Sequence, residues 1–242
     1  MRKISLLLAL LMVATCCMLA SCGEEETSST PEVSSQAPAT SSEAPATSSE
    51  AEPESSEEVS TEPEYEKNPD AIPTEGANVA AGKEYTISEQ FHMSTVDWGY
   101  DESYPASYPD DNFDLTDGVI PPADYQDAGW MAFNQSTPAQ TERGYAYVQF
   151  DLGQSYVISE VTIHSLKHSS AGITCPYQIE VLVSEDNENW YSANVLNIAG
   201  DLDGLADDSV HTLISEMDVT GRYVEIRVTS YGWAFMGEIE IK

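Results

Sequence analysis

The residues that could react with or hold a ligand are mostly carboxylates and aromatic rings. The 242-residue chain contains 42 aspartates and glutamates, 13 tyrosines, four tryptophans and four histidines. It has no G-x-S-x-G or H-E-x-x-H motif, and no cysteine beside a base in a motif of nucleophilic catalysis. A carboxylate pair with the spacing of a glycoside hydrolase is compatible with so acidic a sequence. The sequence therefore favours binding over catalysis and leaves a glycan hydrolase as the weaker alternative.

Aromatic residues are concentrated in one stretch that has no strand pattern. Residues 91–108 include His92, Trp98, Tyr100 and Tyr104, which is an unusual density for a loop. Outside this stretch, Trp233 follows a glycine close to the C-terminus. Trp98 and Trp233 fit equally well as rings packed in a core and as rings presented to a ligand.

The first 21 residues are organised like a secretory signal peptide. Arg2 and Lys3 precede an almost uninterrupted apolar stretch at residues 4–19, which is short for a membrane-spanning helix. The sequence LASC at residues 19–22 resembles the lipobox of bacterial lipoproteins, whose cysteine carries a diacylglycerol. We expect cleavage after residue 21 and an extracytoplasmic protein attached to the cell membrane through a lipid on Cys22. The alternative is an ordinary signal peptide cut elsewhere, which would leave Cys22 free.

The cysteine count does not support an internal disulfide. Cys16 and Cys17 would leave with the signal peptide, and Cys22 would be lipidated. Cys175 then remains alone, so the domain must fold on its hydrophobic core. We expect a buried, inert thiol at Cys175 rather than a nucleophile.

Residues 22–76 are expected to form a disordered, acidic linker rich in Ser, Thr, Pro and Glu. The segment APATSSE occurs at residues 37–43 and again at residues 44–50. Residues 23–76 contain 15 acids against Lys67 alone, so the segment repels itself and extends. The formal net charge of the whole chain, −33, excludes nucleic acid as a partner.

Residues 77–242 form one domain whose apolar residues alternate with polar ones. Val161 and Ile163 alternate with Thr162 and His164, and residues 178–183 and 224–228 repeat this pattern of period two. No window of ten or more residues carries a convincing helical stripe. Short strands separated by turn residues predict an all-β, antiparallel sandwich.

The same domain resembles the discoidin-like, or coagulation factor 5/8 C-type, domains, which include the family 32 carbohydrate-binding modules. This resemblance implies an eight-stranded jelly-roll sandwich of the galactose-binding-domain type and extends over nearly the whole domain. It rests on short motifs in the family's order: NVAAGK at residues 78–83, YPDD at 108–111, LTDG at 115–118, VQFDLG at 148–153, EVLVSEDN at 180–187, GRYV at 221–224 and GEIEI at 237–241.

The resemblance also implies a structural Ca²⁺. Many members of the family hold calcium between the DG loop and the last strand, and the matching side chains here are Asp117 and Glu238. Backbone carbonyls around Leu115 and in residues 124–128 would supply further oxygens, because calcium takes six to eight. The alternative is that Asp117 only caps its turn and Glu238 faces solvent.

Sugar-binding relatives use loops at one end of the sandwich, with an aromatic ring on the sugar's C–H face. The best counterpart is Trp233, supplemented by Trp98 and Tyr100. His168 or Lys167 stands where the galactose-binding members have an arginine, so galactose specificity does not carry over. A solvated loop histidine is an equally good interpretation of His168.

The preferred hypothesis is therefore a membrane-anchored surface lipoprotein whose non-catalytic module binds carbohydrate. A module for protein adhesion or envelope structure, with an envelope protein as its partner, is the alternative.

Overall fold

The computed structural model describes residues 65–242, except 95, 98 and 111–112. The expected signal peptide, Cys22, most of the linker and Trp98 therefore lie outside the described residues. Within the described part, no helix is long and apolar enough to cross a membrane. The elements are β1 (Ile72–Pro73), β2 (Tyr85–Ile87), β3 (Met131–Asn134), α1 (Pro138–Arg143), β4 (Ala146–Lys167), η1 (Ser169–Ala171), β5 (Ile173–Thr174), β6 (Gln178–Ser184), β7 (Tyr191–Asn197), η2 (Leu202–Gly204), β8 (Ser209–Thr229) and β9 (Trp233–Ile241).

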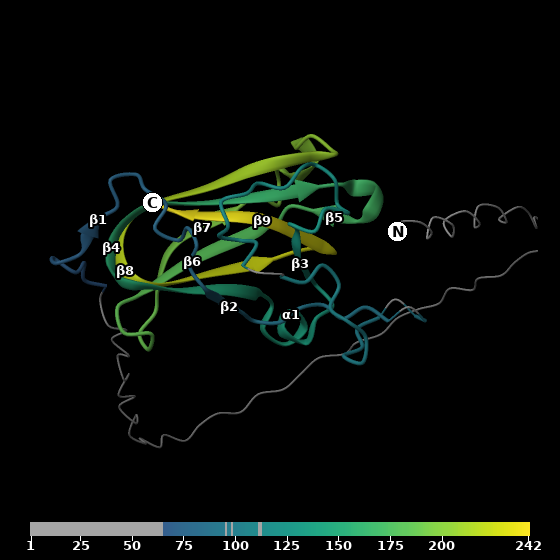
Figure 1. Ribbon diagram of the computed structural model, residues 1–242, viewed down its shortest axis with the longest axis horizontal. Coiled ribbons are helices and arrows are strands. Elements are labelled where there is room, and N and C mark those ends of the chain that lie inside the picture. Colours follow the sequence, from purple (N-terminus) through teal and green to yellow (C-terminus); the bar gives the residue numbers. More distant parts are fainter. Residues whose placement is uncertain (1–64, 95, 98, 111–112) are drawn as a thin grey trace, which may run out of the picture. The chain divides into compact units, whose positions relative to one another are not determined.

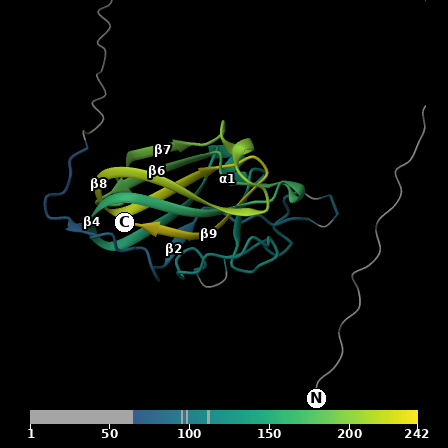
Figure 2. The ribbon, with the colours of Figure 1, turned by 90° about the horizontal axis from the view of Figure 1, so that it is seen from above.

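Two long strands, β4 and β8, run through both layers of the sandwich (Figures 1 and 2). They pair antiparallel over their whole length, with a register shift between Asp151 and Tyr156. Gly153 lies in this corner with φ of 83°, a left-handed conformation that glycine adopts without strain. On one side of the corner the order is β2-β4-β8-β6-β7, and on the other β3-β9-β4-β8. The all-β antiparallel fold expected from the alternating pattern is thus confirmed.

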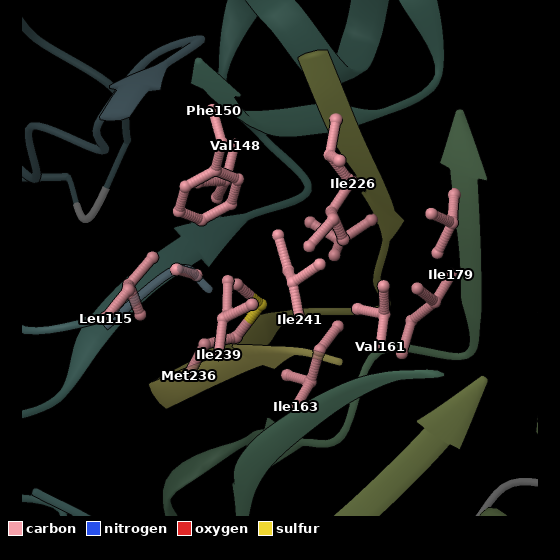
Figure 3. Packing of buried hydrophobic residues seen from close by; sticks show 14 of the residues in the cluster. Leu115, Val148, Phe150, Val161, Ile163, Ile179, Ile226, Met236, Ile239 and Ile241 are labelled. Atoms are coloured by element: carbon pink, nitrogen blue, oxygen red, sulfur yellow. The ribbon is translucent and has the colours of Figure 1, made fainter. Parts of the chain in front are cut away.

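The main core lies between these two layers. Val161 and Ile163 face inward from one layer, and Phe150 and Ile226 face inward from the other. Figure 3 shows side chains from both layers directed toward one another. Each large apolar side chain buried in this way stabilises the fold by roughly 1.5–3 kcal/mol.

A second, smaller hydrophobic cluster covers the outer face of the β3-β9-β4 layer. It consists of Trp130, Ala132, Leu166, Ile173 and Phe235, all of which are at most 1% exposed. Because this cluster covers the outer face, every residue of β4 from Val161 to Lys167 is buried. His164, for which the sequence left exposure open, belongs to this covered face and is 7% exposed.

The folded part begins upstream of the expected boundary at residue 77. The Tyr65 hydroxyl donates to the Thr220 carbonyl (3.2 Å) and accepts from the Thr220 amide, and its ring lies edge-on to Tyr191 at 5.2 Å. Lys67 pairs with Asp218, and β1 adds to β4 as a parallel strand. Residues 65–76 therefore belong to the domain, because Tyr65 supplies an aromatic ring, which the sequence of residues 22–64 lacks.

Cys175 is fully buried in the main core, and this burial raises the pKa of its thiol. The thiolate is the reactive form, so the folded protein should be inert to thiol reagents. We expect no reaction of mature Cys22→Ser protein with a chromogenic disulfide under native conditions, and a full equivalent after denaturation. Rapid reaction of the native protein would contradict this burial.

Candidate functional site

Four connections meet at one end of the sandwich, which we call the loop end: residues 135–145, 168–177, 198–208 and 230–232. They adjoin because β4 ends where β8 begins, and β8 ends where β9 begins. Backbone hydrogen bonds join them: Gln135 N donates to Gly232 O (3.1 Å), and Trp233 N donates to Gly172 O (3.3 Å). The loop end is thus a single surface held by the strand termini.

Trp233 lies at this end as the first residue of β9, and it is half-buried. Its ring is edge-on to Phe91 at 5.0 Å and to Tyr108 at 5.6 Å, and it is 6.2 Å from Phe235. It is also paired between Asn134 of β3 and Ile173 of β5. Trp233 therefore packs against the second cluster and presents only part of its ring to solvent.

A pair of stacked tyrosines, Tyr177 and Tyr231, forms the most exposed aromatic surface of the loop end. Their ring centroids are 4.5 Å apart with an interplanar angle of 20°, and Tyr231 is 64% exposed. The Thr174 hydroxyl donates to the Tyr231 carbonyl at 3.2 Å. Gly232, with φ of 75°, lies so close to the Gly172 carbonyl that a Cβ would approach it to 2.9 Å. The sequence did not single out this pair, although Tyr231 stands two residues before Trp233.

Tyr100 belongs to the aromatic loop at residues 91–108 but is engaged within it. Its ring is 5.9 Å from Phe91 and 6.2 Å from His92. Its hydroxyl donates to Glu89 at 2.9 Å, and desolvation, followed by this carboxylate, raises the pKa of the phenol. Tyr100 therefore stabilises the loop whose Phe91 covers Trp233.

His168 is held from three sides. Its Nδ1 is 2.5 Å from the Asp208 carboxylate, its Nε2 is 3.1 Å from the Ser170 hydroxyl, and its ring is 4.9 Å from that of Tyr125. Asp208 has a positive φ of 50°, which is uncommon for a non-glycine residue. The imidazole thus has one defined orientation at the loop end, partly accessible to solvent.

Lys167, the other basic candidate, is 9% exposed and points into the protein. Its ammonium donates to the carbonyls of Leu202 and Leu205, each at 2.8 Å. These bonds fix the turn at residues 202–205. The charge of Lys167 is therefore engaged by the protein itself, and we assign it no ligand.

The two carboxylates expected to hold calcium are Asp117, which belongs to the DG loop, and Glu238, which lies beneath that loop in β9, five residues beyond Trp233. Glu238 is 2% exposed and accepts a hydrogen bond from the Gly118 amide at 3.2 Å. Desolvation raises its pKa to about 7, and the charge of Asp117 adds to this shift. Asp117 is exposed and accepts from the Val119 amide at 2.7 Å.

The backbone around these carboxylates is also docked on β9, since Ile239 N donates to Leu115 O at 2.8 Å. Among the described residues, no three His, Cys, Asp or Glu side chains group closely enough to hold a metal. Asp117 and Glu238 offer the hard oxygen donors that calcium prefers, and the buried Glu238 carboxylate would gain a countercharge. The donor chemistry thus fits calcium, with carbonyls and water as the further oxygen ligands.

A separate groove of about 460 Å³ lies over β2, β4 and β8. Several of its polar groups are already hydrogen-bonded: Gln149 donates to Asn187 at 2.5 Å, and Asp151 accepts two bonds of 2.8 Å from Arg222, which lies outside the lining. This groove is the alternative to the loop end as the place where a ligand would bind. The lining residues are Glu84, Tyr85, Thr86, Gln149, Phe150, Asp151, Asn187 and Tyr223.

Comparison with solved structures returns proteins that resemble this chain at low sequence identity. They include CpGH89CBM32-5 from Clostridium perfringens, solved with GalNAc-β-1,3-galactose (17% identity, TM-score 0.41, covering 68% of this chain and 98% of that one). A fucose-binding module of Streptococcus pneumoniae shares 14% identity (TM-score 0.44, 68% and 93%). A fucolectin from striped bass serum shares 18% (TM-score 0.43, 68% and 48%).

No curated protein shows significant similarity to this chain. The family model of the F5/8 type C domain matches residues 103–240, which is more than half of the chain. This range includes β3 to β8, most of β9 and all four connections of the loop end. The chain therefore belongs to the F5/8 type C domain family, the discoidin-like family that its motifs resemble.

Proposed function

We propose that this protein is a surface lipoprotein, anchored to the cell membrane through Cys22, whose domain binds glycans without catalysing a reaction. The observation that carries the proposal is the exposed Tyr231 stacked on the half-buried Tyr177, at the same end of the sandwich as the partly exposed Trp233 and the oriented His168. Flat rings with a few fixed polar groups are the usual recognition elements of small-ligand sites. Membership of the F5/8 type C family and the glycans named for similar solved structures support the same choice.

The Cys22 anchor and the acidic linker support a role at the cell surface. A diacylglycerol gives the two acyl chains that stable membrane attachment requires. Many weakly binding copies on one cell would act together, because avidity raises the effective affinity by 10²–10⁴-fold for linked sites. Labelling cells with radioactive fatty acid tests the anchor: wild-type protein should be labelled and Cys22→Ser protein should not.

A glycan array tests the binding function directly. The mature chain with Cys22→Ser, which lacks the lipid but keeps the linker, should be retained by at least one glycan. A blank array, combined with capture of an envelope protein by the same preparation, would contradict glycan binding and establish the protein-adhesion alternative. The array should be run with and without a chelator, which shows whether glycan binding depends on the calcium proposed at Asp117 and Glu238.

One arrangement of side chains suits a serine hydrolase, an enzyme class different from the carboxylate-pair glycan hydrolase considered from the sequence. His168 lies between Ser170 and Asp208: its Nε2 contacts the Ser170 hydroxyl and its Nδ1 contacts the Asp208 carboxylate. The same serine–histidine–aspartate chain of contacts occurs in serine hydrolases. Asp208 is 68% exposed, however, so water screens its charge and the imidazolium gains little from it. We expect no covalent adduct on Ser170 after treatment with a sulfonyl fluoride, as read by mass spectrometry. An adduct that Ser170→Ala removes and Ser169→Ala retains would establish a hydrolase instead.

We also propose that calcium binds at Asp117 and Glu238 and holds the DG loop against β9. When bound, the ion would neutralise the two carboxylates and tie the DG loop to the last strand. Its role would be structural, because the site is separate from the tyrosine pair.

A further inference from the structure

The groove over β2, β4 and β8 has the dimensions of a second ligand site. Its volume, about 460 Å³, lies within the roughly 300–1,000 Å³ that small-ligand sites occupy. Gln149 and Asp151 alternate along β4 with the buried Phe150, so both face outward from the sheet. The register pairs Thr86 with Gln149, and Asp151 with Tyr223. Neighbouring strands lie about 4.8 Å apart, so three strands make a floor roughly 10 Å wide that belongs to the sheet itself.

Part of the groove lining is fixed by Arg222, which lies just outside it. The guanidinium donates two hydrogen bonds of 2.8 Å to Asp151 and lies 4.9 Å from the centroid of the Tyr223 ring. The Gly153 amide also donates to Asp151 at 2.8 Å. The bonds from Arg222 hold the pKa of Asp151 below its ordinary range, so the carboxylate stays ionised and accepts hydrogen bonds. Asp151 and Tyr223 therefore have a defined arrangement before any ligand binds.

An amide pair forms another part of the lining. Gln149 Nε2 donates to Asn187 Oδ1 at 2.5 Å, which joins β4 to the turn between β6 and β7. Asn187 has a φ of 65°, a left-handed conformation in which asparagine is enriched. Each side-chain amide carries two donor hydrogens and an acceptor oxygen, so one bond between the two amides leaves donors and acceptors for a ligand. Such adjacent donors and acceptors suit the hydroxyl groups of a sugar.

The charges around the groove balance one another, although the domain is strongly acidic. Residues 65–242 contain 30 aspartates and glutamates against seven lysines and arginines. At the groove, Asp151 is bonded to Arg222, and the charge of Lys83 lowers the pKa of Asp151 further. Lys83 is also the neighbour of Glu84 in sequence. Two acids thus lie among two bases, and the lining suits a neutral ligand that offers hydroxyls and an apolar face.

We propose that this groove is a second glycan site, which binds a neutral, hydroxyl-rich saccharide independently of the loop end. The Tyr223 ring would contact the apolar face of the sugar. Asp151, Gln149 and Asn187 would bind its hydroxyls. The proposal rests on the proposed glycan-binding function and adds a site to it. With both sites filled, one domain would hold two glycan chains, or two branches of one chain.

The groove and the loop end are far enough apart to be filled separately. Tyr223 lies six residues before Thr229, where β8 ends at the loop end, and this corresponds to about 20 Å of extended strand. A disaccharide is shorter than this separation. We expect the groove to bind more weakly than the loop end, because Tyr223 is half-buried whereas Tyr231 is 64% exposed.

Amide chemical shifts of the mature Cys22→Ser protein test the proposal, with lactose, cellobiose, maltose and the glycan retained on the array as titrants. At least one of these saccharides should shift two groups of resonances in succession. The first group belongs to the loop end. The second, at higher concentration, comprises residues 84–86, 149–151, 187 and 223. Calorimetry with the same saccharide should return two bound molecules per protein.

Variants of the amide pair separate the two binding events. Asn187→Gly and Gln149→Ala should each weaken the second event by about tenfold, the effect of a lost hydrogen bond, and leave the first unchanged. Asn187→Gly should keep the wild-type melting temperature, since glycine adopts this φ without strain. Tyr231→Ala should weaken the first event alone. The matched control is Gln154→Ala, which removes another exposed amide of β4, bonded to the Tyr156 hydroxyl outside the lining, and should retain both events.

Two results would overturn the groove site and leave glycan binding at the loop end standing. One is a shift of loop-end resonances by these saccharides with no shift in the groove. The other is a set of groove shifts that persists unweakened in both amide variants. Failure of every saccharide to bind, both here and on the array, would overturn the proposed function together with the groove site.

Discussion

Replacing Tyr231 with alanine is expected to weaken glycan binding by about ten- to a hundredfold and to leave the melting temperature almost unchanged. The factor corresponds to about 1.4–2.7 kcal/mol, the range of an aromatic anchor in a binding site. Stability should persist because Tyr231 is 64% exposed and its ring stacks on that of Tyr177 at the surface. Titration calorimetry with a glycan from the array, and thermal unfolding of the same samples, measure the two effects.

Two further variants separate the ring of Tyr231 from the packing of its neighbour. Tyr231→Phe should retain most of the affinity, since it keeps the ring. Trp233→Ala should lower stability by about 2 kcal/mol or more, because the indole fills space beside Phe91 and Tyr108. Wild-type affinity in Tyr231→Ala would show that the tyrosine pair is not the binding surface.

Chelation is expected to lower the melting temperature of the wild-type protein. An ion present at a hundred times its dissociation constant stabilises the native state by about 2.7 kcal/mol. Glu238→Gln should remove the response to calcium, since the amide keeps the shape of the side chain and loses its charge. Glu216→Gln, which changes an exposed carboxylate, should respond to chelation like the wild type. An unchanged wild-type melting temperature after chelation would contradict the Asp117–Glu238 site.

In the presence of a chelator, the Glu238 carboxylate is expected to make the free energy of unfolding depend on pH. Burial raises the pKa of Glu238 from 4.5 to about 7, so between these values the native state holds a proton that the unfolded chain releases. Its contribution to stability is therefore complete below about pH 4.5 and is lost as the pH rises through 7. Denaturant titrations across this range should show the loss in the wild type and not in Glu238→Gln.

The sequence predicted the layers of the fold well because burial on one side of a strand leaves a period of two. The pattern fails at residues 161–167 of β4, where both faces are buried by the main core and by the cluster around Leu166 and Phe235. Because this part of β4 is buried on both faces, the sequence suggested the wrong environment for Lys167. It looked like a loop cation beside His168, whereas it is the last residue of β4 and its ammonium closes the turn at residues 202–205.

The aromatic site shows a similar limit. Trp233 stood out as the larger ring near the last strand, but its position depends on pairing with Asn134 and Ile173, which lie far away in sequence. Tyr231 is exposed because the turn at Gly232 carries it out of the sheet, and its partner Tyr177 lies 54 positions earlier. No local pattern could reveal a contact formed by two separate connections.

The described chain enters the domain far from this site. Tyr65 packs at the corner where β8 passes between the layers, and Figure 1 shows this corner and the loop end on opposite sides of the sandwich. A domain tethered through its N-terminal side would therefore present the tyrosine pair away from the point of attachment.

The most direct test of glycan binding at the loop end is an amide chemical-shift titration of the mature Cys22→Ser protein with a glycan selected on the array. The account predicts that the shifted resonances cluster at residues 168–177, 198–208 and 230–233. Shifts confined to the groove lined by Gln149, Asn187 and Tyr223, with the loop end unaffected, would contradict it.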